Sequence, residues 1–291
     1  MTRPLRLATR SSPLALWQAR WVASLLRRAH PALTVVLVPL TSTGDRDRAT
    51  ALYESSTVGL FVKEIQAAVL SGVADAGVHS CKDLPTTSPA GLVLAATPPR
   101  ADVRDCLIGA TVASLPLRAL VGSSSLRRRH QLALLRPDLT FTAIRGNVET
   151  RLRKVATGEV KATMLAAAGL RRLGLGRGLL VTPLDPWSDC VPAPAQGAVA
   201  LDCRSDDPGT QRLLAAIDHQ PTRTAITLER TVLAALEGGC SLPLGCYARR
   251  VEARWRLVAR LAPGDGTCRA CDLSGPALGL ADQAIRAMRG G

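Results

Sequence analysis

Short aliphatic runs alternate with helical segments through the first two thirds of the chain, and this alternation limits the fold more than any other feature. Runs typical of buried strands occupy residues 5–9, 33–40, 75–79, 92–96, 106–108, 120–122, 139–144 and 162–166. Helices are predicted at residues 13–29, 60–70, 124–135 and 148–156. Because strands that alternate with helices are typical of parallel sheets, two α/β sets are expected, separated by a break at Pro98-Pro99.

The last third of the chain follows a different pattern. Residues 182–196 are rich in proline and polar residues and predict a connection, after which residues 198–203 return to a strand pattern. A helix at 225–236, an antiparallel hairpin within 247–261 and a final helix at 278–288 are expected next. The sequence therefore predicts an α/β protein with a smaller C-terminal α+β region.

The formal net charge is +14, and almost all of the positive charge is arginine, because the only lysines are Lys63, Lys82, Lys154 and Lys161. One interpretation is that arginine replaces lysine on ordinary solvated faces. The other is a polyanionic partner, either a nucleic acid or a ligand rich in carboxylates, which a guanidinium pairs two bonds at a time. Aromatic residues make up only 3% of the chain, and no helix-turn-helix or zinc-finger signature is present, so a nucleic acid is not favoured.

The chain contains eight cysteines, and its arginine-bearing N-terminus lacks the apolar segment of a secretory signal. No apolar stretch approaches the ~20 residues needed to cross a bilayer. The thiols are therefore expected to be reduced in the cytoplasm. Cys268-x-x-Cys271 is a weak metal signal without a second pair or a nearby histidine, so no metal is predicted.

Three predicted strand-to-helix turns combine arginine with hydroxyl or amide side chains. They are Thr9-Arg10-Ser11-Ser12-Pro13, Gly122-Ser123-Ser124-Ser125-Leu126-Arg127-Arg128-Arg129 and Arg145-Gly146-Asn147. A helix N-terminus offers unpaired N–H groups, and added hydroxyls and arginines make an anion pocket. The alternative is plain helix capping with the arginines on a solvated face. Because neither a dinucleotide-binding glycine fingerprint nor a Walker A motif is present, a carboxylate-rich ligand is favoured over a nucleotide.

Two further segments carry groups that suit catalysis. His79-Ser80-Cys81-Lys82-Asp83-Leu84-Pro85 follows a buried strand, and its lone carboxylate could donate a proton to a leaving amine and then stabilise the cation left behind. The alternatives are that Asp83 caps a helix or pairs with Lys82, and His79 is interpreted as a packed strand residue. Glu237-Gly238-Gly239-Cys240 ends a helix with a loop thiol that suits covalent attachment, although a lone cysteine is usually a small buried hydrophobe.

Taken together, these segments resemble the motifs of the porphobilinogen deaminase (hydroxymethylbilane synthase) family. The matching segments are residues 7–15, 79–85, 122–128, 144–148, 168–174, 195–198 and 237–240. They follow the family order, and the resemblance runs from residue 5 to about residue 250. Motifs that are individually long and collectively ordered make chance a poor explanation.

The resemblance implies a transferase of haem and porphyrin biosynthesis that joins four porphobilinogen molecules into the linear tetrapyrrole hydroxymethylbilane, with release of ammonia. It implies two doubly wound α/β domains that resemble periplasmic binding proteins, at residues 1–98 with 198–217 and at residues 99–197. A third α+β domain with an antiparallel sheet spans residues 218–291. The implied protein is a cytoplasmic monomer whose partner is the small molecule porphobilinogen, without nucleic acid or membrane.

The resemblance also implies roles for individual residues. Asp83 is the implied catalytic residue, which assists loss of ammonia, stabilises the azafulvene-like cation and helps deprotonation after the carbon–carbon bond forms. Cys240 is implied to hold one dipyrromethane cofactor through a thioether. The other implied cofactor-binding residues are Ser80, Lys82, Ser125, Arg127 and Arg128. The implied substrate-binding residues are Arg10, Ser12, Arg145, Arg151 and Arg172.

The sequence departs from the family pattern at two places. The loop before residue 60 is usually rich in glycine and lysine, whereas here it contains Glu54, and Val58 replaces a common lysine. Ala195 replaces a glycine before Gln196-Gly197. Two alternatives therefore stay open: a specialised paralogue that makes a shorter or altered oligopyrrole, and a non-enzymatic two-lobed anion-binding protein. The intact mass of the purified chain separates a binding protein from an enzyme, because a covalent dipyrromethane adds mass.

Overall fold

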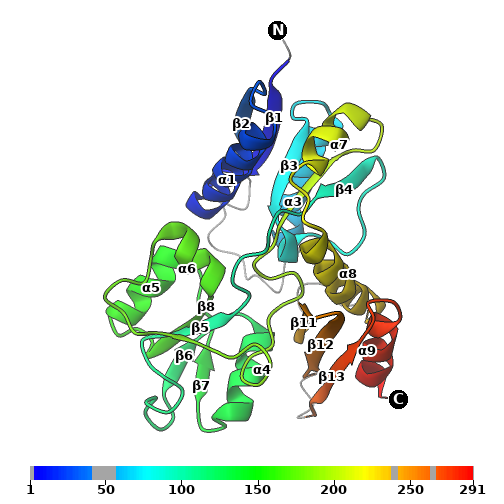
Figure 1. Ribbon diagram of the computed structural model, residues 1–291. Coiled ribbons are helices and arrows are strands. Elements are labelled where there is room, and N and C mark those ends of the chain that lie inside the picture. The colour runs from blue at the N-terminus through cyan, green and yellow to red at the C-terminus, as the bar shows by residue number, and fades with distance from the viewer. Residues whose placement is uncertain (1–2, 41–56, 237–241, 263–266, 291) are drawn as a thin grey trace. The chain divides into compact units, whose positions relative to one another are not determined.

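The computed structural model of the chain describes residues 3–40, 57–236, 242–262 and 267–290. The chain divides into two compact units, one formed by Met1–Arg100 with Ala198–Thr224 and the other by Ala101–Gly197 with Ala225–Gly291. Each unit therefore combines segments that are far apart in the sequence (Figure 1). The division into three domains stays a prediction.

The first unit contains a five-stranded sheet with the strand order β2-β1-β3-β10-β4. Its strands are β1 (Leu5–Arg10), β2 (Val35–Leu40), β3 (Ala76–Ser80), β4 (Leu92–Ala96) and β10 (Val199–Arg204). Its helices are α1 (Pro13–Ala29), α3 (Thr57–Leu70) and α7 (Pro208–Ala215), and the short 3-10 turn η1 (Cys81–Asp83) follows β3.

Helices cover both faces of this sheet. Successive side chains of a strand point to opposite faces, and the strands carry apolar residues on both of them. On one face, α1 and α7 pack on β-strand residues such as Leu7, Val78 and Leu201. On the other face, Ile65 of α3 packs near Ala8 of β1. Figure 1 shows α1 beside β1 and β2. The sheet is therefore doubly wound, as the sequence predicts.

The second unit contains a sheet with the strand order β7-β6-β8-β5-β9. Its strands are β5 (Asp105–Ile108), β6 (Leu120–Gly122), β7 (Thr140–Thr142), β8 (Ala162–Ala166) and β9 (Val181–Pro183), and its helices are α4 (Leu126–Leu135), α5 (Val148–Ala156) and α6 (Ala167–Leu173). One face packs on Leu132 of α4, and the other packs on Leu152 of α5 and Leu170 of α6.

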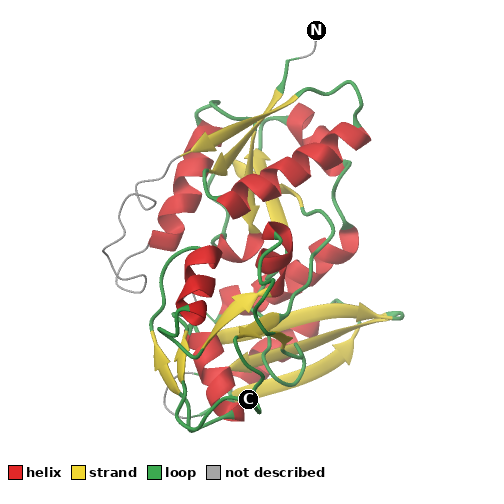
Figure 2. Cartoon of the chain, turned by 90° about the vertical axis from the view of Figure 1, so that its left-hand side faces the viewer, coloured by secondary structure: helices red, strands yellow, loops and turns green. Residues whose placement is uncertain are grey.

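The C-terminal part of the second unit is an antiparallel sheet with the order β11-β12-β13. Its strands are β11 (Leu244–Val251), β12 (Arg254–Leu261) and β13 (Arg269–Gly275), accompanied by α8 (Gln220–Ala235) and α9 (Leu280–Arg289). One face of the sheet packs on α8 and α9, as Figures 1 and 2 show near the C-terminus. On the other face, Tyr247 and Val258 pack with Val103 and Val191.

The predicted fold class, two doubly wound α/β parts and a small α+β part with an antiparallel sheet, is confirmed. The prediction of parallel sheets is wrong for part of each sheet. Strand β10 runs antiparallel to β3 and β4, and β5 runs antiparallel to β8 and β9. Both β5 and β10 follow points where the chain crosses between units, so no helical crossover sets their direction.

Among the described elements, two helices, α6 and α7, two strands, β9 and β13, and the 3-10 turn η1 were not predicted from the sequence. The two helices are short, and β9 is three residues long and ends at Pro183. Strand β13 is a sheet edge whose residues are mostly exposed, so it lacks the aliphatic run that marks a buried strand. No helix in the described part of the chain is long and apolar enough to cross a membrane.

Candidate active site

The predicted catalytic residue Asp83 lies in the turn that directly follows β3. The amide of Leu84 donates to the carbonyl of Cys81 at 3.2 Å, which closes this turn. Asp83 is half-buried, and its carboxylate makes no hydrogen bond or ion pair with any described residue. The alternatives, in which Asp83 caps a helix or pairs with Lys82, are therefore not observed.

Arg10 and Ser12 lie at the end of β1, which is the parallel neighbour of β3. Because parallel strands end at the same edge of a sheet, Arg10 and Ser12 share this edge with Ser80, Lys82 and Asp83. The Ser12 hydroxyl caps α1 by accepting from the amide of Ala15 at 3.4 Å. Capping is thus confirmed for Ser12, and its hydroxyl proton stays available for an acceptor in a ligand.

The candidate residues of the second unit come from the ends of three neighbouring parallel strands, β6, β7 and β8. Strand β6 leads to Ser125, whose hydroxyl caps α4 by accepting from the amide of Arg128 at 3.4 Å. Strand β7 leads to Arg145 and then to α5, which carries Arg151, while β8 leads directly into α6, which carries Arg172. The fold therefore gathers hydroxyl and arginine side chains from three motifs at one sheet edge.

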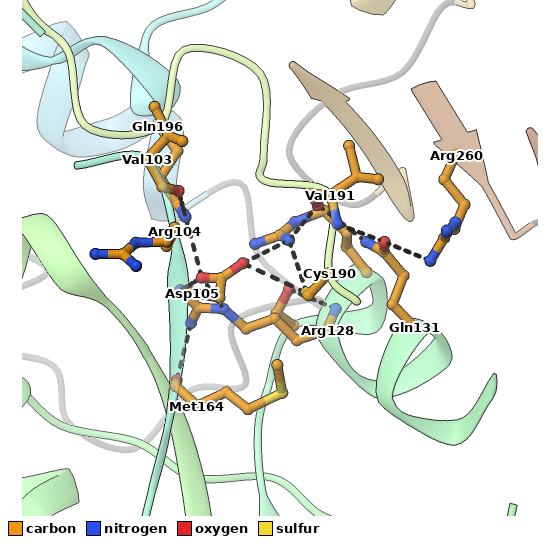
Figure 3. Close-up of polar contacts among 12 residues, drawn as sticks. Val103, Arg104, Asp105, Arg128, Gln131, Met164, Cys190, Val191, Gln196 and Arg260 are labelled. Carbon is orange, nitrogen blue, oxygen red and sulfur yellow. Dashed lines mark hydrogen bonds and ion pairs between the residues drawn. The ribbon is translucent and has the colours of Figure 1, made fainter. Parts of the chain in front are cut away.

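Arg127 and Arg128 are held by a buried carboxylate, Asp105 of β5. Arg127 donates from Nη1 at 2.7 Å, and Arg128 donates from Nε at 3.0 Å and from Nη2 at 2.7 Å. The amide of Gln196 adds a further bond to the carboxylate at 3.0 Å. Figure 3 shows Arg128, Cys190 and Gln196 around Asp105. The carboxylate has no exposed side-chain surface, and the two arginine side chains are 6% and 9% exposed.

The pKa values separate two kinds of arginine in this unit. Burial alone would lower the pKa of Arg127, but the Asp105 carboxylate raises it above its usual value. Burial, with a smaller effect of the nearby Arg128 charge, lowers the pKa of Arg151 to about 10. Burial likewise lowers the pKa of Arg172 to about 10. Arg127 is thus paired with a protein carboxylate, whereas burial disfavours the charged forms of Arg151 and Arg172, which a bound anion would stabilise.

Arg151 shows this imbalance in its contacts. Its Nε donates to the carbonyl of Gly146 at 2.9 Å, and no carboxylate of a described residue pairs with it. Arg172 donates from Nη2 to the carbonyl of Gly197 at 2.9 Å. Backbone carbonyls thus help to orient both guanidinium groups.

The attachment residue Cys240 lies outside the described residues, as do the loop residue Glu54 and the side chain of Val58. The helix that precedes Cys240, α8, is anchored by the fully buried Glu229. This carboxylate accepts from the amide of Ala195 at 2.6 Å and from the amide of Ala248 at 2.8 Å. Ala195 has a φ of 61°, in the left-handed region that favours the glycine usual at this position.

Sequence reasoning missed Asp105, Gln196 and Glu229 as organising residues. An acidic residue at the start of a buried strand in an arginine-rich chain was the available signal for Asp105. Within the described part of the chain, no cluster of histidine, cysteine, aspartate or glutamate side chains could hold a metal ion. The candidate residues are thus a lone carboxylate in the first unit, and hydroxyls and arginines in each of the two units.

Weak structural likenesses are found among solved structures. The periplasmic aliphatic sulphonate binding protein of Escherichia coli is 17% identical, with a TM-score of 0.43, covering 81% of this chain and 71% of that one. A periplasmic binding protein of Salmonella typhimurium with high arginine specificity is 11% identical, with a TM-score of 0.42, covering 76% of this chain and 94% of that one. At these scores neither likeness carries an argument about function.

The family comparisons are far stronger. Residues 5–212 match the model "Porphobilinogen deaminase, dipyromethane cofactor binding domain", and residues 223–271 match "Porphobilinogen deaminase, C-terminal domain". A porphobilinogen deaminase of Moorella thermoacetica is 45% identical over 265 residues, which cover 90% of this chain and 84% of the relative. The chain therefore belongs to the porphobilinogen deaminase family.

Proposed function

We propose that this chain joins four porphobilinogen molecules into the linear tetrapyrrole hydroxymethylbilane, releasing one ammonia at each step, with Asp83 as the catalytic residue. The matched family domain binds a dipyrromethane cofactor. When bound, this group supplies the pyrrole carbon to which the first substrate is joined. The remaining chemistry falls to the side chains of the two sheet edges.

Asp83 acts on the substrate in three ways. It assists departure of the aminomethyl nitrogen as ammonia, which breaks a carbon–nitrogen bond and leaves a positive charge spread over the pyrrole ring and its methylene carbon. The carboxylate then stabilises this cation. After the new carbon–carbon bond forms, it accepts the proton released from the attacking pyrrole carbon. A carboxylate suits all three steps because it exchanges protons and opposes positive charge.

The observation that carries this assignment is the lack of a protein partner for the Asp83 carboxylate among the described residues, although Asp83 is half-buried. Elsewhere in the fold, buried carboxylates such as Asp105, Asp202 and Glu229 are bound by protein donors. A half-buried carboxylate that no described residue binds is available to a ligand. Its place next to Lys82, at the same sheet edge as Arg10, suits a substrate that carries both carboxylates and a developing cation.

The arginine motifs fit the charges of the ligands. Each pyrrole unit carries an acetate and a propionate, so the bound chain gains two carboxylates at each addition. Arg145, Arg151 and Arg172, with Arg10 and Ser12, are assigned to the incoming substrate and the growing chain. Ser80, Lys82, Ser125, Arg127 and Arg128 are assigned to the carboxylates of the cofactor, and Cys240 to its thioether. The lowered pKa values of Arg151 and Arg172 support this division, because both residues gain from a bound anion.

Arg127 and Arg128 require a narrower role. Arg128 donates through Nε, Nη1 and Nη2 to Asp105 and to the carbonyl of Met164. Only its remaining N–H groups are left for a ligand, so this residue contributes at most part of a bidentate contact. Arg127 and Arg128 are thus held rigidly by Asp105, while Arg151 and Arg172 bind the larger share of the ligand carboxylates.

The proposed protein is a cytoplasmic monomer with three domains, at residues 1–98 with 198–217, 99–197 and 218–291. Burial raises the pKa of Cys106 to about 11 and that of Cys190 to about 12. Such thiols are poor nucleophiles and do not compete with Cys240 for attachment of the cofactor. Sedimentation at micromolar concentration tests the monomer, and a mass twice that of the chain contradicts it.

The catalytic role is tested with Asp83→Asn, compared with Asp206→Asn, which changes an aspartate whose side chain is 85% exposed. Ammonia release from porphobilinogen is measured for both variants, together with intact mass and thermal unfolding. We expect Asp83→Asn to retain the fold but to lose at least about 100-fold in turnover, within the range of general acid–base catalysis. Near-normal ammonia release by folded Asp83→Asn would refute the assignment.

A further inference from the structure

Two buried polar contacts meet β3, the strand that leads into the Asp83 turn, from opposite faces of its sheet. Strand β3 ends with His79 and Ser80, and successive residues of a strand point to opposite faces. Ala76 and Val78 pack on the side of α1, so Ser80 points to that side as well. His79 points to the side of α3. The last two residues of β3 therefore make contacts with two different helices.

On the α3 side, His79 belongs to a chain of three polar side chains. Its Nε2 lies 3.0 Å from Oδ1 of Asp202 on β10, and Nε2 of Gln66 on α3 donates to Oδ2 of the same carboxylate at 3.1 Å. Since the carboxylate only accepts, Nε2 of His79 carries the proton. His79, Asp202 and Gln66 are 4%, 3% and 5% exposed, so water does not replace these bonds.

Gly77 leaves the space that this chain occupies. A side-chain carbon at this position would lie 2.4 Å from Oδ1 of Asp202 and 2.6 Å from Nε2 of His79. Both distances are shorter than non-bonded atoms tolerate. Gly77 and Asp202 are direct partners across β3 and β10, so the contact is built into the pairing of the two strands.

On the α1 side, Gln18 and Ser80 bind each other through two hydrogen bonds. Nε2 of Gln18 donates to Oγ of Ser80 at 2.9 Å, and Oγ of Ser80 lies 3.3 Å from Oε1 of Gln18. Gln18 is 2% exposed and lies on the face of α1 that packs on the sheet. This contact fixes the strand residue three positions before Asp83 to a helix that begins beside Arg10.

We propose that Gln18 and Gln66 are positioning residues for Asp83, which act from opposite faces through Ser80 and through the Asp202–His79 pair. This inference rests on the proposed catalytic role of Asp83. We call these five residues the β3 clamp. Directional hydrogen bonds on both faces resist sliding and rotation of the strand end, which apolar packing allows more readily. The Asp83 turn follows directly, and the Asp83 carboxylate itself makes no hydrogen bond or ion pair with a described residue.

The test replaces each glutamine by methionine, which has a similar length but cannot form these bonds. Gln18→Met and Gln66→Met are compared with Gln211→Met in the same unit. Gln211 also ties a helix to a strand, since its Nε2 donates to the carbonyls of Arg204 and Ser205. Those carbonyls lie at the end of β10 that pairs with the start of β3, away from Asp83. The control therefore loses a similar contact at the opposite end of the sheet.

We expect kcat for ammonia release to fall about 10- to 100-fold in Gln18→Met and Gln66→Met, because small displacements of a catalytic group have effects of this size. KM should change less than about threefold, since the arginines that bind substrate are unaltered, and the cofactor mass should persist. Gln211→Met should lower the thermal midpoint by less, because Gln211 is only half-buried, and should retain the kcat of the parent.

Either of two results would overturn the positioning role: a kcat in both variants equal to that of Gln211→Met, or a rise in KM that accounts for the whole loss. If Gln66→Met does not fold because the buried Asp202 loses one of its two side-chain partners, Gln18→Met gives the decisive comparison. A parent that releases no ammonia, or a fully active Asp83→Asn, refutes the proposed function instead. The two failures are therefore distinguishable.

Discussion

Replacing Asp105 by asparagine is expected to be the most destabilising single change in the second unit. The substitution removes the one negative charge that Arg127 and Arg128 share and leaves both guanidinium groups buried. It also turns an amide toward the N–H groups of Arg127, Arg128 and Gln196, so donors face donors. Removing one partner of a buried ion pair costs about 3–5 kcal/mol, and the two arginines place this case near the upper value.

The expected loss has a defined size in an unfolding experiment. About 4–5 kcal/mol is a large part of the roughly 5–15 kcal/mol by which folded proteins are stable. At about 2 °C per kcal/mol for a chain of this size, the thermal midpoint should fall by roughly 10 °C. Urea unfolding and calorimetry of Asp105→Asn are compared with Asp206→Asn, whose exposed side chain should contribute little.

The pH dependence of this loss provides a second test. Burial alone would raise the pKa of Asp105, but Arg127 and Arg128 hold it well below its usual value of 3.8. A carboxyl group with a lowered folded pKa contributes stability that is complete above the unfolded pKa and decreases as the pH falls toward the folded one. The difference between parent and variant should therefore be constant from pH 5 to 8 and shrink below about pH 4. A loss under about 1 kcal/mol at pH 7 would refute the role of this carboxylate.

Three further predictions concern residues that the family pattern singles out. Cys240→Ser should give a folded chain without the cofactor mass, because a serine hydroxyl ionises far less readily than a thiol. The control Cys268→Ser, which changes an exposed cysteine, should keep the cofactor mass. Cofactor mass on Cys240→Ser would disprove attachment at Cys240. Val58→Lys should reduce the population of enzyme carrying one to three added pyrroles after a brief pulse of porphobilinogen, since a lysine offsets carboxylates that accumulate with elongation. An unchanged mass ladder would exclude residue 58, at the start of α3, as a limit on elongation. Ala195→Gly should change the unfolding free energy by less than about 1 kcal/mol, because relief of the left-handed φ of 61° is offset by greater freedom of the unfolded chain. A rise in the unfolding free energy above about 2 kcal/mol, measured by calorimetry, would contradict this balance.

The elements that could be predicted from the sequence are those whose pattern is local. The helix at Val148–Ala156 has clear signals at its start, because Gly146 and Asn147 precede it and Asn147 caps it. The motif segments located Asp83 and the arginines of the second sheet edge for the same reason. The hydroxyl and turn residues of each motif segment are adjacent in sequence, so the local pattern alone indicates a strand that leads into a helix.

The contacts that could not be predicted join residues that are far apart in the sequence. Asp202 is 123 residues from His79, and Gln196 is 91 residues from Asp105. Nothing in the segment around Gln18 indicates that its amide binds Ser80. Strand direction was also inaccessible, since whether β10 enters the sheet parallel or antiparallel depends on where the chain returns from the second unit. Local periodicity specifies an element, whereas its partners depend on the assembled sheet.

The position of β10 in the first sheet has a consequence for synthesis of the protein. In the order β2-β1-β3-β10-β4, β3 and β4 are joined only through β10, which is made about a hundred residues after β4. A nascent chain that has emerged only as far as residue 197 therefore exposes two unpaired strand edges, and such edges favour pairing with other chains. The second unit's sheet, formed from residues 105–183, has all its strands by then. We expect the sheet of residues 105–183 to form before the N-terminal sheet closes. Truncation before β10 should therefore yield aggregates rather than a stable N-terminal fragment.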